Sequence, residues 1–241
     1  MKVVLILSGG VDSSTLLYYL LHKGYSIHAL TFIYGQKHSK EIDCAKKVTE
    51  HASRIGPVIH KIVDISSIHE LISKGAITGD DEIPEGYYTE DKQRLTIVPN
   101  RNMILLSIAA GYAVKLGLRE VYYAAHKSDC MYPDCRKEFI KAMDTAIYLA
   151  NIWEPVELKA PFIDMKKVEI VSLGLQLGVP YELTWSCYSG GERPCLKCGT
   201  CVERTEAFIL NNSRDPLLSE IEWKRAVEIL EEFKNRNITR I

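Results

Sequence analysis

The sequence predicts an α/β fold with a doubly wound, Rossmann-like parallel sheet and a helical, zinc-binding appendage at the C-terminal end. Short apolar runs alternate with amphipathic segments over residues 1–177, as expected where helices connect parallel strands. The first run, residues 3–7, contains no polar side chain, which is typical of a strand covered on both faces. In such sheets ligands bind at the carboxyl ends of the strands.

The expected elements follow this alternation in order. Strands are predicted at residues 3–7, 27–33, 58–65, 121–125 and 156–162. Helices are predicted at residues 13–23, 39–55, 102–116, 136–150, 166–177, 200–210 and 217–233. Several of these helices end at a glycine, a common helix terminator. Residues 74–94 are polar and contain glycine, so we expect a long surface loop there that can act as a lid.

Composition limits the classes of partner. The 241 residues include 30 Lys+Arg and 31 Asp+Glu, a net charge of −1, so we expect no nucleic-acid partner. The N-terminal apolar run is shorter than the roughly 7 residues of the smallest signal-peptide core, and no later run approaches the roughly 18 residues of a membrane span. We therefore expect a cytoplasmic protein without a membrane partner.

The alternation of apolar runs and amphipathic segments changes after residue 184. We therefore expect a main domain at 1–184 and an appendage at 185–241 that joins it in one structural unit.

A glycine loop, "LSGGVDSST", follows the first strand. It matches neither the Walker A loop nor the Rossmann turn. Its glycines allow the backbone to approach a phosphate closely, and the following helix start favours anions. Asp12 could bind Mg²⁺ or cap the helix. The predicted nucleotide-binding residues are Leu7, Ser8, Gly9, Gly10, Val11, Asp12, Ser13, Ser14, Thr15, Leu16 and Leu17.

This loop resembles the SGGxDS loop of the N-type ATP pyrophosphatases, the PP-loop superfamily. The resemblance implies an adenine nucleotide alpha hydrolase-like fold, cleavage of ATP between its α and β phosphates, and adenylation of an acceptor oxygen. The loop then holds the departing pyrophosphate, which accounts for the missing lysine. Because amidotransferases, NAD synthetases and tRNA thiolation enzymes share the loop, it indicates the reaction better than the substrate.

Four of the seven cysteines form a set with metal-binding spacing: Cys187, Cys195, Cys198 and Cys201. Four thiolates suit one tetrahedral Zn²⁺ per chain, and because no ligand position stays open the site should be structural. Free cysteines, a redox pair and an iron–sulfur cluster are alternatives. Arg193, Lys197 and Arg204 are near enough in sequence to offset the charge of the thiolates.

Four further strings extend the resemblance over nearly the whole chain: YGQKHSKE at 34–41, VPNRN at 98–102, YPDCR at 132–136 and TWSCY at 184–188. With the glycine loop and the cysteines they resemble the 7-cyano-7-deazaguanine (preQ0) synthase family. The resemblance implies a ligase that converts 7-carboxy-7-deazaguanine, ammonia and ATP to preQ0 through an adenylated acid and an adenylated amide, releasing AMP and pyrophosphate, for queuosine or archaeosine biosynthesis. It also implies a homodimer.

The resemblance also indicates catalytic roles. Asp12 and Ser13 belong to the loop, and Arg101 and Lys167 are candidate cations for phosphate or adenylate. Arg101 could instead brace a helix start, and Lys167 could be a solvated helix lysine. His38 is expected to deprotonate ammonia or contact a phosphate, unless its role is structural.

Substrate recognition is assigned to Tyr132, Asp134 and Arg136, which could alternatively form a proline turn with an Asp cap. Trp185 could stack on the substrate ring or pack beside the cysteine loop. Residues 125–131 depart from the family pattern, so the resemblance does not support substrate contacts there. Two rival functions remain: a tRNA thiolation enzyme, which needs a catalytic cysteine and a basic RNA surface, and a nucleotide- and zinc-binding module without turnover.

Overall fold

The computed structural model describes residues 1–37, 40–129 and 131–238, so the predicted catalytic residue His38 and also Cys130 lie outside the described residues. In this described part, five parallel strands form one sheet in the order β3-β2-β1-β4-β5. The strands are β1 (Lys2–Ile6), β2 (Ser26–Ile33), β3 (Val58–Asp64), β4 (Glu120–Tyr122) and β5 (Glu157–Lys159). The order reverses between β1 and β4, which confirms the doubly wound fold and creates a crevice there.

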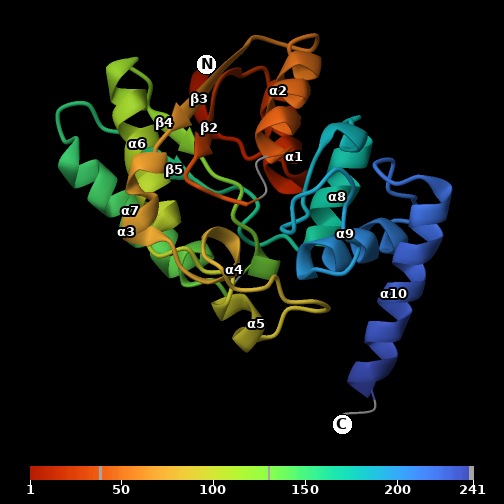
Figure 1. Cartoon of the computed structure of the whole chain (residues 1–241). Helices are drawn as coiled ribbons and strands as arrows, with labels where there is room; N and C mark the ends of the chain where they lie inside the picture. The colour runs from red at the N-terminus through yellow and green to blue at the C-terminus, as the bar shows by residue number, and fades with distance from the viewer. Residues whose placement is uncertain (38–39, 130, 239–241) are drawn as a thin grey trace.

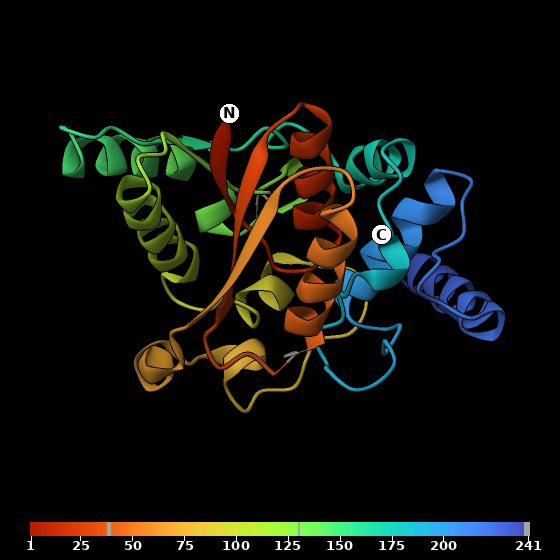
Figure 2. The same ribbon diagram turned by 90° about the horizontal axis from the view of Figure 1, so that it is seen from above.

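Helices cover both faces of the sheet (Figure 1, Figure 2). One side has α1 (Val11–His22), α2 (Lys40–Ala52) and α8 (Lys167–Gln176), and the other has α6 (Arg101–Lys115) and α7 (Lys137–Ala150). Alternate residues of β1 therefore pack into the two hydrophobic cores on opposite faces of the sheet. Val3 and Leu5 pack with α1 and α2, whereas Val4 and Ile6 pack with α6 and α7. This two-sided burial is why the first strand is an unbroken apolar run.

The segment after β3 differs from the expected loop. It contains η1 (Ser66–Ile68), α3 (His69–Ile72), α4 (Gly75–Thr78) and α5 (Glu90–Arg94). Ala76 and Ile77 of α4 are buried, and the side chain of Thr89 caps α5. The expected surface loop at 74–94 is thus interrupted by α4 and α5, while η1 and α3 precede it. Helices of four or five residues are too short to produce an amphipathic period in the sequence. Strands β4 and β5, at three residues each, are also shorter than predicted.

The C-terminal segment packs against the sheet domain through α9 (Gly199–Leu210), while α10 (Glu220–Ile238) lies outside it (Figure 1). Ala207 and Phe208 of α9 join the core formed by α1 and α8. Arg204 forms a buried ion pair with Asp215, at 2.6 Å, and donates to the hydroxyl of Thr184 at 2.8 Å. None of the described helices is both long and apolar enough to cross a bilayer.

Candidate active site

A cavity of about 220 Å³ lies at the carboxyl ends of β1, β2 and β4, where the strand order reverses. Its walls come from the glycine loop, the segment that follows β4, the start of α6, the cysteine loop and α9. The crevice is the expected ligand position for this topology. It has two chemically different ends, one at the glycine loop and the other at Arg101.

The glycine loop forms the first end. Gly9 has φ +82°, and a Cβ there would lie 2.4 Å from the carbonyl oxygen of Glu41, so only glycine fits. The hydroxyls of Ser8 and Ser13 are 2.9 Å apart, and the N–H of Gly10 donates to Ser8 Oγ at 3.3 Å. Helix α1 starts directly behind the loop, so its first free N–H groups face the same end. The arrangement provides hydroxyl and N–H donors for an anion.

The structure separates the predicted nucleotide-binding residues into two groups. Cavity-lining residues are Leu7, Ser8, Gly10, Val11, Asp12 and Ser13. Leu16 and Leu17 are instead fully buried in the core, and Thr15 bonds to the hydroxyl of Tyr181 at 2.7 Å. Gly9 shapes the turn without lining the cavity, and Ser14 is buried beneath it.

Lys167, at the first turn of α8, reaches across the cavity to Asp12. Its Nζ lies 2.5 Å from Asp12 Oδ2, and both side chains are largely buried. Burial alone would raise the pKa of Asp12, but Lys167 and then His126 hold it well below the ordinary value. Burial alone would lower the pKa of Lys167, but Asp12 and Asp129 raise it above the ordinary value. Both groups are therefore charged at neutral pH, and Lys167 is not a solvated surface lysine.

His126 joins this ion pair, although sequence reasoning assigned it no role. The fully buried ring places Nε2 3.0 Å from Asp129 Oδ2 and 3.5 Å from Asp12 Oδ2. Burial alone would lower the pKa of His126, but the two aspartates raise it above the ordinary value. Ala125 and Asp129 also line the cavity, so the segment that departs from the family pattern contributes to this site.

Arg101 defines the second end of the cavity. Its guanidinium lies 5.9 Å from the ring centre of Tyr34 and donates to Asn102 Oδ1 at 3.2 Å. Five tyrosines line the cavity: Tyr34, Tyr88, Tyr123, Tyr132 and Tyr188. Within the described residues no carboxylate forms an ion pair with Arg101. A half-buried cation that faces a cavity and forms no ion pair with a carboxylate suits an anionic ligand, and the tyrosine rings suit a planar one.

The other residues assigned to the substrate occupy different places. Tyr132 lines the cavity and its hydroxyl lies 2.6 Å from Thr96 Oγ1, whereas Asp134 and Arg136 are not in the cavity wall. Arg136 is exposed and forms the N-cap of α7. Trp185 packs beside the cysteine loop, where its Nε1 donates to the carbonyl of Cys187 at 2.9 Å, and it also lines the cavity; stacking on the substrate ring stays a prediction.

The four predicted cysteines converge into one cluster. Their sulfur atoms all lie within 4.8 Å of one another, and Cys195 Sγ is 4.0 Å from Cys201 Sγ. Four sulfurs about 2.3 Å from one tetrahedral ion would be about 3.8 Å apart. The backbone N–H groups of Cys195 and Cys198 each donate to a cysteine sulfur at 3.3 Å. The cluster thus has the donor set and the spacing of a metal site.

The expected counter-charges each have a carboxylate partner. Arg193 pairs with Glu222, Arg204 pairs with Asp215, and Lys197 lies 3.5 Å from Glu85. Burial alone would lower the pKa of Arg204, but Asp215 and Cys201 raise it, so Arg204 also interacts with the cysteine set. Backbone N–H groups contact the sulfurs as well.

Comparison with known proteins agrees with this site. The family model described as "Queuosine biosynthesis protein QueC" matches residues 2–212. The chain belongs to this family. It is 69% identical over 238 residues to the 7-cyano-7-deazaguanine synthase of Archaeoglobus fulgidus, covering 98% of each chain. It is 52% identical over 223 residues to the protein of the same name from Caldicellulosiruptor bescii, covering 92% of this chain and 99% of that one.

A solved structure shows that this QueC-family chain shares its fold with a more distant protein. The U34-tRNA thiolase NcsA from Methanococcus maripaludis, with its [4Fe-4S] cluster, aligns with a TM-score of 0.51 and 18% identity. The alignment covers 100% of this chain and 73% of that one. At this identity the likeness concerns the fold alone.

Two further residues of the QueC-family site carry no sequence signal. Glu203 lines the cavity from α9, and burial raises its pKa to about 7 despite the nearby Lys167. Tyr88 lines the cavity from the segment between α4 and α5. Glu203 is two residues after Cys201, so the sequence could have indicated that Glu203 lies near the cysteine loop. That Glu203 lines the cavity is seen only in the fold.

Proposed function

We propose that this QueC-family chain is a 7-cyano-7-deazaguanine synthase, a ligase that forms preQ0 from 7-carboxy-7-deazaguanine, ammonia and ATP. The observation that carries the proposal is the single cavity with two ends. The glycine loop and Lys167 suit the phosphates of ATP, while Arg101 and the tyrosines suit a planar ring bearing a carboxylate. Relatives at 69% and 52% identity bear the same name.

The first half of the reaction converts the acid to an amide. The substrate carboxylate attacks the α phosphate, the bond between the α and β phosphates breaks, and pyrophosphate leaves. Hydroxyls of Ser8 and Ser13 and the first N–H groups of α1 stabilise the departing pyrophosphate. Arg101 neutralises the carboxylate and then the adenylate. Ammonia adds to the acyl carbon, and AMP leaves to give the amide.

The second half removes the amide oxygen. This oxygen attacks the α phosphate of a second ATP, pyrophosphate leaves again, and the amide nitrogen loses one proton. Loss of AMP together with the second N–H proton then gives the nitrile. Both halves need an intermediate protected from hydrolysis. The tyrosines line the cavity near Arg101, Trp185 lines it beside the glycine loop, and together they supply that protection. His38 is proposed to assist ammonia, and Asp134 and Arg136 to contact the ring after rearrangement of their turn.

The residues fit the two metals proposed here. Asp12 Oδ1 is buried and has no hydrogen-bond partner in the described residues, so it is a free oxygen ligand for Mg²⁺ beside the phosphates. Mg²⁺ would neutralise phosphate charge, and Asp12 would hold it while orienting Lys167. The four cysteine sulfurs fit one structural Zn²⁺, since all four lie within 4.8 Å of one another and can reach one ion together.

A tRNA thiolation enzyme is the principal rival. It needs a catalytic cysteine, and among the described residues Cys135 is the cavity-lining cysteine outside the metal set. Burial raises the pKa of the Cys135 thiol, which lies 3.4 Å from the hydroxyl of Tyr123. A neutral thiol is a poor nucleophile. This environment favours a packing role for Cys135 and the synthase over the thiolation enzyme.

Cys135→Ser is therefore expected to retain preQ0 formation within about fivefold, because a packing residue contributes no covalent step. The measurement incubates enzyme with ATP, 7-carboxy-7-deazaguanine and ammonium, and quantifies AMP, pyrophosphate and preQ0. Release of ADP, or AMP that does not depend on the deazapurine, would rule out the ligase. Loss of all turnover in a folded Cys135→Ser protein would favour covalent chemistry. Absence of any nucleotide turnover in the wild type would favour the binding module.

We also propose that the protein is a cytoplasmic homodimer and that residues 185–241 form one unit with residues 1–184. Its product serves queuosine or archaeosine biosynthesis, and the protein has no nucleic-acid partner.

Exposed apolar side chains gather at the end of α7: Tyr148, Leu149, Ile152 and Trp153, the last 95% exposed. Such a patch is typical of an interface. Trp153→Glu is expected to shift the protein from dimer to monomer in sedimentation equilibrium. A wild-type protein that stays monomeric would contradict the homodimer.

A further inference from the structure

Tyr88 brings a hydroxyl into the cavity to which the proposed chemistry assigns no role. Its ring packs against Gly199, the first residue of α9. A Cβ built at Gly199 would lie 2.4 Å from Tyr88 Cζ, so the contact leaves no room for any other side chain. The ring position is therefore fixed by the backbone of α9.

The chain around Tyr88 is held to the cysteine loop. Gly86 N–H donates to the carbonyl of Lys197 at 2.7 Å, and Glu85 forms an isolated antiparallel bridge with Cys198. The Glu85 carboxylate lies 3.5 Å from Lys197 Nζ. These contacts lie immediately before Tyr88 and restrain its backbone. The side chain is thus positioned before any ligand binds, which lowers the entropic cost of a contact with that ligand.

The hydroxyl of Tyr88 is buried and has no hydrogen-bond partner within the described residues. Buried hydroxyls are normally paired, because an unpaired one loses its bonds to water. The neighbouring Tyr87 follows this rule, since its hydroxyl donates to Glu206 Oε1 at 2.9 Å. Burial raises the pKa of the Tyr88 hydroxyl, and Tyr188, Tyr132, Cys198 and Glu203 raise it further; all of these but Cys198 line the cavity.

We propose that the Tyr88 hydroxyl forms a hydrogen bond to the heterocyclic ring of the deazapurine and orients its 7-carboxylate toward the α phosphate. The inference rests on the proposed synthase function. The ring of 7-carboxy-7-deazaguanine presents N–H donors and a carbonyl acceptor in its plane, and a hydroxyl can pair with either. The deazapurine belongs at this end because Arg101, which has no carboxylate partner in the described part of the chain, suits its carboxylate. Adenine carries no such group.

Tyr88→Phe tests the inference because it removes only the hydroxyl. The KM for 7-carboxy-7-deazaguanine is expected to rise about tenfold, the effect of one uncharged hydrogen bond, with the KM for ATP unchanged within about twofold. The melting temperature without ligand should stay the same or rise, because an unpaired buried hydroxyl is removed. Tyr87→Phe is the matched control: it should lower the melting temperature and leave both KM values unchanged.

Other outcomes separate this inference from the proposed function. An unchanged KM for the deazapurine in Tyr88→Phe, or a rise confined to ATP, would overturn the role of the hydroxyl while leaving the synthase intact. If the wild type forms no preQ0, the proposed function fails. Calorimetric binding of 7-carboxy-7-deazaguanine to wild type and Tyr88→Phe then still decides the inference, since equal dissociation constants would overturn it.

Discussion

Asp12→Asn is expected to slow preQ0 formation by about a thousandfold, or about 4 kcal/mol of transition-state stabilisation. The substitution keeps the shape of the side chain but removes the charge that pairs with Lys167 at 2.5 Å. It also replaces the oxygens proposed to hold Mg²⁺ with a neutral amide. Lys167 would then lose its partner and its fixed position at the phosphates. Quenched-flow measurement of AMP and pyrophosphate in a single turnover would report the chemical step directly.

Asp144→Asn provides a matched control for the loss of one carboxylate. Asp144 Oδ1 accepts a hydrogen bond from the N–H of Leu158 at 2.7 Å and lies outside the cavity wall. This variant should keep the turnover of the wild type, although its stability can change. Circular dichroism of Asp12→Asn establishes that the fold is retained. A folded Asp12→Asn enzyme with turnover within tenfold of the wild type would remove Asp12 from the catalytic machinery.

The two halves of this Asp12–Lys167 pair illustrate what the sequence could and could not predict. Asp12 lies in a local motif between an apolar run and a helix. The hydrophobic pattern of these two segments is enough to predict that Asp12 lies at the end of a strand. Lys167 is 155 positions later and was assigned through family resemblance, because no local pattern links it to the loop. The strand order brings them together at the crevice.

His126 and Tyr88 were missed for the same physical reason. Each lies in irregular chain, where side-chain direction depends on long-range contacts rather than on a helical or strand period. His126 is positioned by its contacts with Asp12 and Asp129, and Tyr88 is positioned by the backbone of Gly199. The cysteine set behaves differently. Its ligand spacing constrains the loop locally, so the convergence of the sulfurs could be predicted from the sequence.

Cys198→Ser is expected to lose both metal and stability. A serine hydroxyl is a poor Zn²⁺ ligand, and the free energy of structural zinc binding, of order 10 kcal/mol, is coupled to folding. The cysteine loop also carries Trp185 and Tyr188 into the cavity and restrains the chain before Tyr88 through Cys198 and Lys197. Metal analysis should find about one zinc per wild-type chain and much less in the variant. Thermal unfolding should shift to lower temperature, and binding of the deazapurine should weaken.

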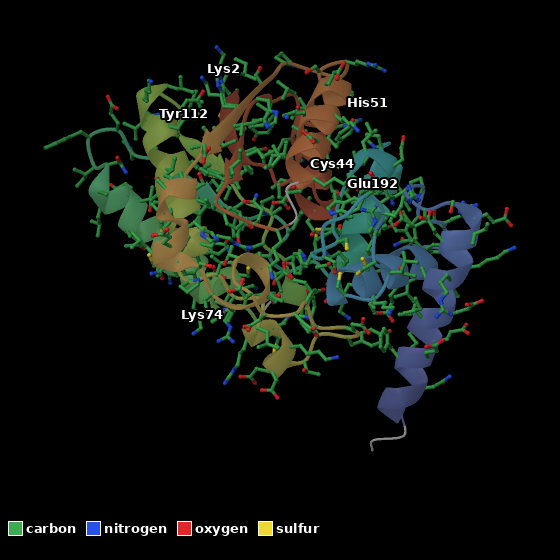
Figure 3. All side chains as sticks on the ribbon, viewed as in Figure 1. Lys2, Cys44, His51, Lys74, Tyr112 and Glu192 are labelled. Atoms are coloured by element: carbon green, nitrogen blue, oxygen red, sulfur yellow. The ribbon has the colours of Figure 1, made fainter. Side chains whose placement is uncertain are left out.

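Cys44→Ser is the control that separates ligation from burial. Cys44 lies on α2 and is 7% exposed (Figure 3). It belongs to the same apolar cluster as three of the proposed ligands, but not to the set of converging sulfurs. Its replacement removes a buried thiol at comparable depth, so it should reduce stability modestly and leave the zinc content unchanged. If Cys198→Ser keeps the metal, or loses it without loss of stability, a structural site is contradicted. Iron and sulfide in place of zinc would assign the four thiolates to a cluster.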